Sequence, residues 1–502
     1  MVSENMLRVK QLLFGWQRGL LAVLTILVSL SSIAQDDRIP LPDMGNSASN
    51  FLTEKEEKQY ANALIRQMRA YEVLVEDPQI SAYFENMGFQ IVAHSDRPAK
   101  PFHFVVLDQS RINAFAAPGG VIALHSGLIL AAESEHEVAG VLAHEVAHIT
   151  QLHLYRTLES SQRMTIPIAL AMLGLILAGG GSGDAVAGAL MGGSGLAQQM
   201  QINFTRANES EADRIGIITL HRAGFDPLGM AGFFSKLNRL TRPNGEGPPE
   251  FLRTHPVTVN RIAEARNRAA NMSPVEKSNG LDFFLMQARV RALLEENPAE
   301  AITYFEDKLQ KGATGSEQLS LQYGLAISLQ RHSDYERAYE LLLALQIQDP
   351  GRLSYQLQLA DLDLERKEYD PALQRMEDLY HSFQGNHAIA MQYSEALLAE
   401  EDPQRAETAS IILRQQILFR PEDPELYALY AKAANISQDH VRATEAIAES
   451  YYQRGGTKEA IEQLERLSKD SELDYYQRAR ISDRLLELRI EIVETGEMDK
   501  DS

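Results

Sequence analysis

The stretch Gly140-Val141-Leu142-Ala143-His144-Glu145-Val146-Ala147-His148 contains the pattern H-E-x-x-H. Apolar residues flank the pattern at helical intervals, so the stretch is predicted to lie on a buried helix. On such a helix His144 and His148 are one turn apart on the same face, where both imidazoles can bind one Zn²⁺. Glu145 is then placed to take a proton from zinc-bound water and pass it to a leaving amine. The stretch therefore predicts zinc-dependent cleavage of peptide bonds.

A third protein ligand must come from outside this helix, because Leu154 stands where one class of zinc proteases has a further histidine. Downstream, residues 208–213 read Asn-Glu-Ser-Glu-Ala-Asp on a stretch with helical character. Glu209 and Asp213 share one helix face, so Glu209 could ligate zinc while Asp213 fixes the tautomer of a ligand imidazole. Glu211 is expected to take no part in metal binding. The spacing alone fits a solvated acidic face equally well.

Composition narrows the classes of protein further. The chain has 502 residues, of which 44% are hydrophobic and 23% charged, so a wholly disordered chain, a collagen and a polytopic membrane protein are excluded. It has no cysteine, which excludes disulfides, thiolate zinc fingers, iron–sulfur clusters and cysteine nucleophiles. The net charge of −21, without a local basic patch, argues against nucleic-acid binding. Any metal site must therefore use His, Asp or Glu.

The N-terminus has the features of an export signal. Basic residues precede an apolar run, Gly19–Leu30, and the small residues Ser32 and Ala34 follow two apart. This order predicts a cleavable signal peptide over residues 1–34. The apolar run is shorter than the roughly 20 residues that span a bilayer, although an uncleaved anchor is the alternative. Residues 35–50 are polar, contain two prolines and are expected to form a linker or an extended arm.

Residues 51–270 are predicted to form one domain that combines helices with a small sheet. Two segments, Phe102–Leu107 and Val121–Leu124, have strand-like composition. The second follows the turn residues Pro118-Gly119-Gly120. The two are expected to belong to a small sheet that contains a hairpin, and helical patterns dominate the rest of the domain.

Residues 277–493 are predicted to be helical and repetitive, with a polar tail over residues 494–502. Small residues recur about every 34 residues in two registers, as in tetratricopeptide repeats. The first register is Ala301, Ala338, Ala372, Ala406 and Ala443, and the second is Ala326, Ala360 and Ser394. A generic helical bundle with coincidental alanines is the alternative. Repeat arrays of this kind bind protein segments on a concave face, so this half is predicted to hold partners or substrates.

Three motifs together resemble a known family. They are H-E-V-A-H at His144–His148, E-x-x-A-D at Glu209–Asp213, and the upstream segment Asn113–Gly120, which reads N-A-F-A-A-P-G-G. They resemble the gluzincin family of HtpX-type and CAAX-prenyl-protease metallopeptidases. The signal peptide and the C-terminal repeats are most similar to the periplasmic β-barrel assembly-enhancing metalloproteases of that family. The expected fold is mainly α: a gluzincin domain with a small β-hairpin sheet, followed by an all-α tetratricopeptide-repeat solenoid.

The resemblance implies roles for individual residues. Glu209 would be the third ligand of one Zn²⁺ per chain, and Asp213 would join Glu145 as a catalytic-site residue. His255 follows a Pro- and Gly-rich stretch, and the resemblance implies a fourth ligand that caps the zinc and keeps the enzyme latent. On the residues alone it is equally a surface-loop histidine. The strand Val121–Leu124 is expected to pair with an extended substrate peptide.

The resemblance also implies a function. The chain is expected to be a periplasmic zinc endopeptidase with chaperone activity. Its partners would be unfolded or misassembled outer-membrane β-barrel proteins and the β-barrel assembly machinery, with no nucleic acid. The alternative is a chaperone or assembly scaffold with a largely latent zinc site. Glu145 favours the enzyme, because a structural zinc site needs no base.

Two further features of the sequence are an apolar segment and a group of histidines outside the motifs. Residues 164–197 are apolar and rich in glycine. They are expected to form a lid over the cleft, with a buried helical hairpin and a reversible peripheral membrane contact as alternatives. The remaining histidines with no paired ligand at useful spacing are assigned to the core or the surface: His103, His125, His136, His153 and His221.

Overall fold

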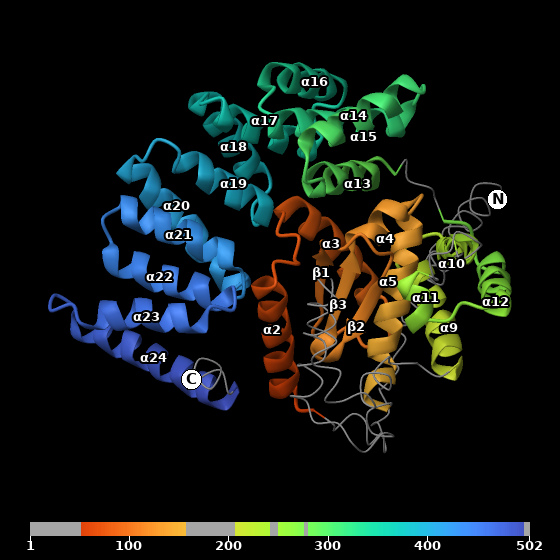
Figure 1. Ribbon diagram of the computed structural model, residues 1–502, viewed down its shortest axis with the longest axis horizontal. Helices are drawn as coiled ribbons and strands as arrows, with labels where there is room; N and C mark the ends of the chain where they lie inside the picture. The colour runs from red at the N-terminus through yellow and green to blue at the C-terminus, as the bar shows by residue number, and fades with distance from the viewer. Residues whose placement is uncertain (1–51, 157–205, 241–248, 276–279, 496–502) are drawn as a thin grey trace, which may run out of the picture. The chain divides into compact units, whose positions relative to one another are not determined.

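A computed structural model describes residues 52–156, 206–240, 249–275 and 280–495, which belong to one compact unit (Figure 1). Several predicted features lie outside the described residues: the signal peptide at 1–34, the arm at 35–50, the segment 164–197, and residues 496–502 of the tail. Among the described helices, none combines the length and the apolar character that crossing a membrane requires.

A three-stranded sheet lies at the centre of the first half. Strands β1 (His103–Leu107), β2 (Ala114–Ala117) and β3 (Val121–His125) are ordered β1-β3-β2. β1 runs parallel to β3, and β2 pairs with β3 in an antiparallel hairpin through the turn η2 (Pro118–Gly120). The predicted hairpin-containing sheet is therefore present. β2 was not predicted as a strand, because its sequence Ala-Phe-Ala-Ala lacks the β-branched residues that mark strands.

The position of β3 corrects the prediction for substrate pairing. β3 is hydrogen-bonded on both sides, so the strand Val121–Leu124 has no free edge for an extended peptide, and the prediction is wrong. Among the described residues, the outer edge of β2, the strand next to β3, pairs with no other strand. The N–H of His125 donates to the carbonyl of Asn113, and antiparallel ladders alternate, so odd-numbered residues of this segment face β3. The backbone groups of Ile112, Ala114 and Ala116 therefore face outward.

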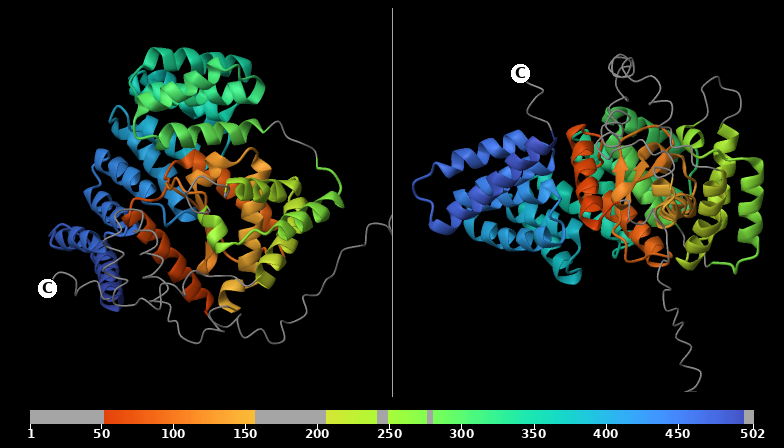
Figure 2. Two further views of the ribbon diagram at one scale, coloured as in Figure 1. Left: turned by 45° about the vertical axis from the view of Figure 1, so that its right-hand side comes forward. Right: turned by 90° about the horizontal axis from the view of Figure 1, so that it is seen from below.

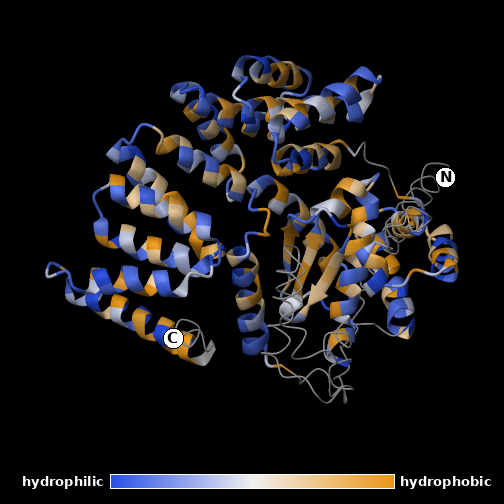
Figure 3. Ribbon diagram, in the orientation of Figure 1, coloured by the Kyte–Doolittle hydropathy of each residue, from blue (hydrophilic) through white to orange (hydrophobic). Residues whose placement is uncertain are grey.

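Helices cover both faces of the sheet (Figures 1 and 2). α2 (Glu54–Ala70), which begins with a capping box between Thr53 and Glu56, packs on one face. α3 (Pro78–Ala93) and α5 (Glu135–Thr150) pack on the other, and the short α4 (Ser126–Ala131) follows β3. Figure 3 shows hydrophobic residues along all three strands, as expected for a sheet buried on both sides.

Four more helices complete the first half. They are α9 (Arg206–Arg222), α10 (Leu228–Leu240), α11 (Glu250–Thr254) and α12 (Val259–Ala270). α5 is buried along its whole length from Glu137 to Thr150, because the sheet, α9 and α10 surround it. Two glycines permit this close packing. A Cβ on Gly140 of α5 would lie 2.7 Å from the Cα of Met230, and one on Gly216 of α9 would lie 3.0 Å from the carbonyl oxygen of Ala143.

The second half is an array of antiparallel helix pairs (Figure 1). Its helices are α13 (Leu281–Leu294), α14 (Pro298–Gln310), α15 (Gly315–Arg331), α16 (Tyr335–Gln348), α17 (Leu353–Glu365), α18 (Tyr369–Ser382), α19 (His387–Leu397), α20 (Pro403–Phe419), α21 (Pro424–Ile436), α22 (His440–Gln453), α23 (Thr457–Ser468) and α24 (Tyr475–Thr495). The first register of small residues lies in α14, α16, α18, α20 and α22, and the second in α15, α17 and α19. All eight residues are buried. The predicted solenoid of helix–turn–helix repeats is confirmed.

α13 contributes to the hydrophobic cores of both halves. Phe283 and Val290 pack into the core formed by the sheet, α3 and α5, whereas Leu285 packs into the core of the first repeats. On the same helix the buried Arg289 forms a bidentate ion pair with Asp77, the N-cap residue of α3, at 2.6 and 2.9 Å. α13 therefore joins the first half to the array.

Replacing Arg289 by alanine is expected to destabilise the protein by about 3–5 kcal/mol, because Asp77 would remain buried without its partner. Burial opposes ionisation of Asp77, but Arg289 outweighs it and holds the pKa of this carboxyl below its usual range. The stabilisation is thus present above the pKa of an unfolded aspartate and is lost as the pH falls through the lowered value. Urea unfolding at neutral pH measures the effect. Arg337→Ala is the control, because its pair with Glu306 is exposed and is expected to contribute less than about 1 kcal/mol. An equal loss of unfolding free energy in the two variants would contradict a stabilising role for the buried Arg289–Asp77 pair.

Candidate metal centre

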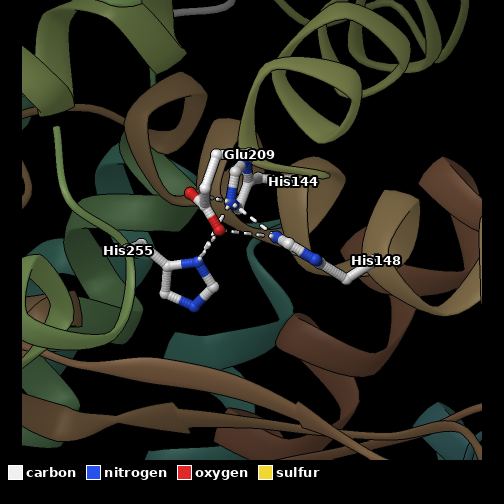
Figure 4. Close-up of side chains that lie close together, drawn as sticks. All are labelled: His144, His148, Glu209 and His255. Carbon is white, nitrogen blue, oxygen red and sulfur yellow. Dashed lines mark hydrogen bonds and ion pairs between the residues drawn. The ribbon is translucent and has the colours of Figure 1, made fainter. Parts of the chain in front are cut away.

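Four of the predicted site residues converge on one point (Figure 4). α5 provides His144 and His148, α9 provides Glu209, and His255 follows the C-terminus of α11. All four are buried, and one ligand atom of each lies within 4.8 Å of the others. His144 and His148 lie on one face of a buried helix, as their spacing predicted.

The separations of the ligand atoms suit a tetrahedral metal ion. The Nε2 atoms of His144 and His148 are 3.0 Å apart. The Nδ1 of His255 lies 3.4 Å from the Nε2 of His144 and 3.0 Å from Oε1 of Glu209. The same Oε1 lies 3.5 Å from the Nε2 of His148. A tetrahedral ion with bonds of about 2.0–2.1 Å places its ligand atoms about 3.3–3.4 Å apart. Three imidazoles and one carboxylate therefore lie at separations close to those of a four-coordinate metal site, with all four ligand atoms within 4.8 Å of one another.

The electrostatic environment favours a cation at this point. Burial opposes ionisation of Glu209, but His255 and His144 outweigh it and hold the pKa of this carboxyl far below its usual range. Burial, with His144 and His255 nearby, lowers the pKa of His148 well below its usual value. Burial would also lower the pKa of His144, but hydrogen bonds to Asp213 and Glu209 raise it to about 9. Glu209 is thus a carboxylate and His148 a neutral imidazole, the forms in which these ligands bind metals, whereas a metal at His144 has to displace a proton.

Glu145 lies beside this group without being one of the four. It is fully buried, and neither carboxylate oxygen meets the geometry of a hydrogen bond to a described residue, although the nearby backbone N–H of Ala116 acts to lower the pKa of this carboxyl. Oε1 lies 3.5 Å from the Nε2 of His255. Burial raises the pKa of Glu145, while His255 and His144 oppose the increase. A buried carboxylate with unpaired oxygens is costly, and a water molecule held at a metal would satisfy it.

Asp213 lies beside the His144 ring. Its Oδ1 is 3.0 Å from the Nδ1 of His144, on the side of the ring away from the other ligands. Arg261 of α12 binds both oxygens of Asp213 at 2.7 and 2.8 Å and also reaches Oε2 of Glu209 at 2.7 Å. The Arg261–Asp213 pair thus contacts the Nδ1 side of the His144 ring. Arg261 was not predicted, because nothing in its local sequence links it to two residues of α9.

Sequence reasoning also missed a contact of His153, which it assigned to the core or the surface. The residue is buried, and its Nδ1 lies 3.0 Å from the Nδ1 of His148. Helical spacing could not reveal this contact, because α5 ends at Thr150 and Leu152 adopts a positive φ of 58° that turns the chain. The other four histidines of that group do not reach the four ligands.

His255 is placed differently from a surface-loop residue. Residues Glu250–Thr254 form the short helix α11, and His255 is its buried C-cap. Its ring stacks on Phe251, with the centroids 4.8 Å apart. The N–H of Phe251 donates to the carbonyl of Ile112, which faces outward from the β2 side of the sheet, and Arg111 pairs with Glu250 at 3.1 Å. α11 therefore holds His255 in the site and covers one end of the free strand edge.

Comparison with known proteins places this geometry in a family. The model of peptidase family M48 matches residues 76–269, which include every predicted site residue. The β-barrel assembly-enhancing protease of Escherichia coli (strain K12) is 33% identical over 476 residues, or 94% of this chain and 96% of that protein. The chain belongs to this family of M48 peptidases. The resemblance predicted from the three motifs is therefore confirmed.

Other relatives extend the comparison. The β-barrel assembly-enhancing protease of Yersinia pestis is 35% identical over 450 residues, which cover 89% of this chain and 91% of that protein. The mitochondrial metalloendopeptidase OMA1 of Saccharomyces cerevisiae is 29% identical over 203 residues, which cover 39% of this chain and 51% of that protein. M48 members are metallopeptidases, so the buried His and Glu cluster is the candidate metal centre of a metalloprotease.

Proposed function

We propose that the protein is a zinc endopeptidase whose metal is held by His144, His148 and Glu209. The convergence of these side chains beside the unpaired carboxylate of Glu145 carries the proposal. A bound zinc ion lowers the pKa of a water ligand and polarises a peptide carbonyl. Glu145 accepts the proton of the attacking water at its carboxylate and delivers it to the leaving amine nitrogen. Asp213 keeps the Nδ1 proton of His144 in place, so that Nε2 faces the metal.

With a metal bound, His255 would occupy the coordination position that a reacting carbonyl and water need, so the resting protein would be closed. A catalytic zinc site has three protein ligands and one open position. With the Nδ1 of His255 as fourth ligand, Glu145 would face an imidazole instead of a water. Opening requires α11 to move away from the site, and α11 is held to the strand edge by the N–H of Phe251 and by the exposed pair of Arg111 with Glu250.

The substrate is proposed to be an extended polypeptide that pairs with the outer edge of β2. The backbone groups of Ala114 and Ala116 face outward there, and β2 packs beside α5, which carries Glu145. Pairing with a strand edge fixes a peptide by its backbone and leaves its sequence largely free. The end of this edge, at the carbonyl of Ile112, is occupied by Phe251 of α11. A peptide that extends over this end displaces α11, and with it His255.

The biological substrates are proposed to be outer-membrane β-barrel proteins that are unfolded or misassembled, and the compartment is proposed to be the periplasm. The names of the full-length relatives and the predicted signal peptide support this proposal. The array would hold the client or the β-barrel assembly machinery, and with it the protein would act as a chaperone. A scaffold with a largely latent zinc site is the second candidate, which the capped arrangement of His255 favours.

Removing the metal should abolish cleavage. Purified full-length protein is expected to cleave an unfolded outer-membrane β-barrel protein, to lose this activity with a chelator and to regain it with Zn²⁺. Glu209→Gln should bind at least tenfold less zinc and lose activity in parallel, because a neutral amide is a poor replacement for an anionic ligand. Metal content by atomic absorption and gel analysis of the products measure both. Cleavage that survives complete removal of the metal would refute the proposed enzyme, and bound zinc without any cleavage would favour the scaffold.

A further inference from the structure

His148 makes a polar contact on each side of its ring. Its Nε2 faces the other predicted ligands, and its Nδ1 lies 3.0 Å from the Nδ1 of His153. The two rings are nearly perpendicular, with centroids 4.9 Å apart. The Nε2 of His153 lies 3.1 Å from Oε2 of Glu211, and Arg156 reaches the same oxygen at 3.4 Å. A chain of contacts therefore runs from the metal site through His153 to Glu211.

The contacts fix which nitrogen of each ring carries the proton. Glu211 is an acceptor, so the Nε2 of His153 donates to it, and the Nδ1 of a neutral His153 is an acceptor. The Nδ1 of His148 must then donate to His153, which leaves the lone pair on the Nε2 of His148. This is the nitrogen that faces His144 and Glu209. With one proton on each ring, no contact in this chain joins two donors.

We propose that His153 and Glu211 form a positioning pair for His148. The pair selects the tautomer of His148 that binds the metal and holds the plane of its ring. It is the counterpart of Asp213 and Arg261, which do the same for His144. The inference rests on the proposed metal site, and it assigns a role to the ligand histidine that Asp213 does not reach. Glu211, expected from sequence spacing to be a neutral control, belongs to the site.

The position of Glu211 makes the pair testable without disturbing the core. His153 is fully buried, but the side chain of Glu211 is 33% exposed and Arg156 is 42% exposed. Removing the carboxylate leaves the His153 ring in place and frees it to adopt the other tautomer. Loss of an outer contact to a metal ligand typically lowers metal affinity about 10–100-fold.

The test measures zinc affinity by competition with a fluorescent chelator and the visible absorption spectrum of the Co²⁺-loaded full-length protein. His153→Leu is expected to weaken zinc binding about 10–100-fold and to change the Co²⁺ spectrum. His153→Gln should recover part of the affinity, since its amide oxygen can accept from the Nδ1 of His148. His136→Leu is the matched control, because His136 lies on α5 with His148 but contacts the backbone N–H of Asp226 and no ligand. It should bind zinc like the wild type.

Glu211 supplies a second pair of variants should His153→Leu fail to fold. Glu211→Ala is expected to lower zinc affinity about tenfold, and Glu211→Asp to restore most of it. Wild-type zinc affinity and an unchanged Co²⁺ spectrum in both His153→Leu and Glu211→Ala would overturn the positioning pair and leave the metal site intact. A wild-type protein that binds neither Zn²⁺ nor Co²⁺ would overturn the metal site and this inference together.

Discussion

Replacing Glu145 by glutamine should leave zinc bound and lower the rate of substrate cleavage by about 10²–10⁴-fold, the usual contribution of a general base. The substitution keeps the shape of a fully buried side chain and removes only its ability to take a proton. Zinc content by atomic absorption and cleavage of an unfolded β-barrel protein, measured on the same preparation, test both parts of the expectation.

A matched variant separates loss of the base from loss of acidic charge near the site. Glu137→Gln lies on the same helix, two turns before Glu145, where its carboxylate accepts from the backbone N–H of Glu133. It should cleave at the wild-type rate. Glu145→Gln protein that keeps its zinc and cleaves as fast as the wild type would remove Glu145 from the mechanism.

Replacing His255 by alanine should accelerate cleavage while the zinc stays bound. Three protein ligands remain, and the vacated position admits water and a carbonyl. If the uncapped state of the wild type is populated at about 1–10%, its release by the mutation raises turnover about 10–100-fold. Initial rates of cleavage of the same unfolded barrel protein, together with self-cleavage during storage, measure the gain.

His221→Ala controls for the loss of a histidine, because His221 lies on α9 but contacts the backbone carbonyl of Ser273 and not the metal site. It should behave like the wild type. A His255→Ala protein that keeps its zinc but cleaves no faster than the wild type would refute the cap. Loss of both zinc and activity would make His255 an ordinary ligand.

The sequence allowed much of the site to be predicted, because helical spacing is a local property. His144 and His148 were assigned to one helix face, and Glu209 and Asp213 to another, and each pair lies as expected. The repeats were equally accessible, since close helix packing requires a small residue in each copy. Which residues of two helices meet at one point depends on tertiary contacts. Spacing left the role of Glu209 open, so the family resemblance decided it and also supplied the role of His255.

The remaining features depend on contacts that no local pattern records. β2 is made of Ala-Phe-Ala-Ala, so neither its strand state nor the central place of β3 could be read from propensity. His153 reaches His148 only because the chain turns at Leu152. No local pattern marked Glu250–Thr254 as a helix whose C-cap is His255, so the place of this residue in the fold could not be predicted from its sequence neighbours.

The glycines that let α5, α9 and α10 pack closely also affect the distances between the candidate metal ligands. Gly216 packs against the carbonyl of Ala143, the residue just before His144. The close approach of these two backbones therefore helps to set the distance from Glu209 to the histidines. A methyl group at position 216 would push α9 outward by a few tenths of an ångström. Metal–ligand distances are expected to vary by only about 0.2 Å, so the absence of a Cβ at Gly216 is needed to keep the ligands at the right spacing.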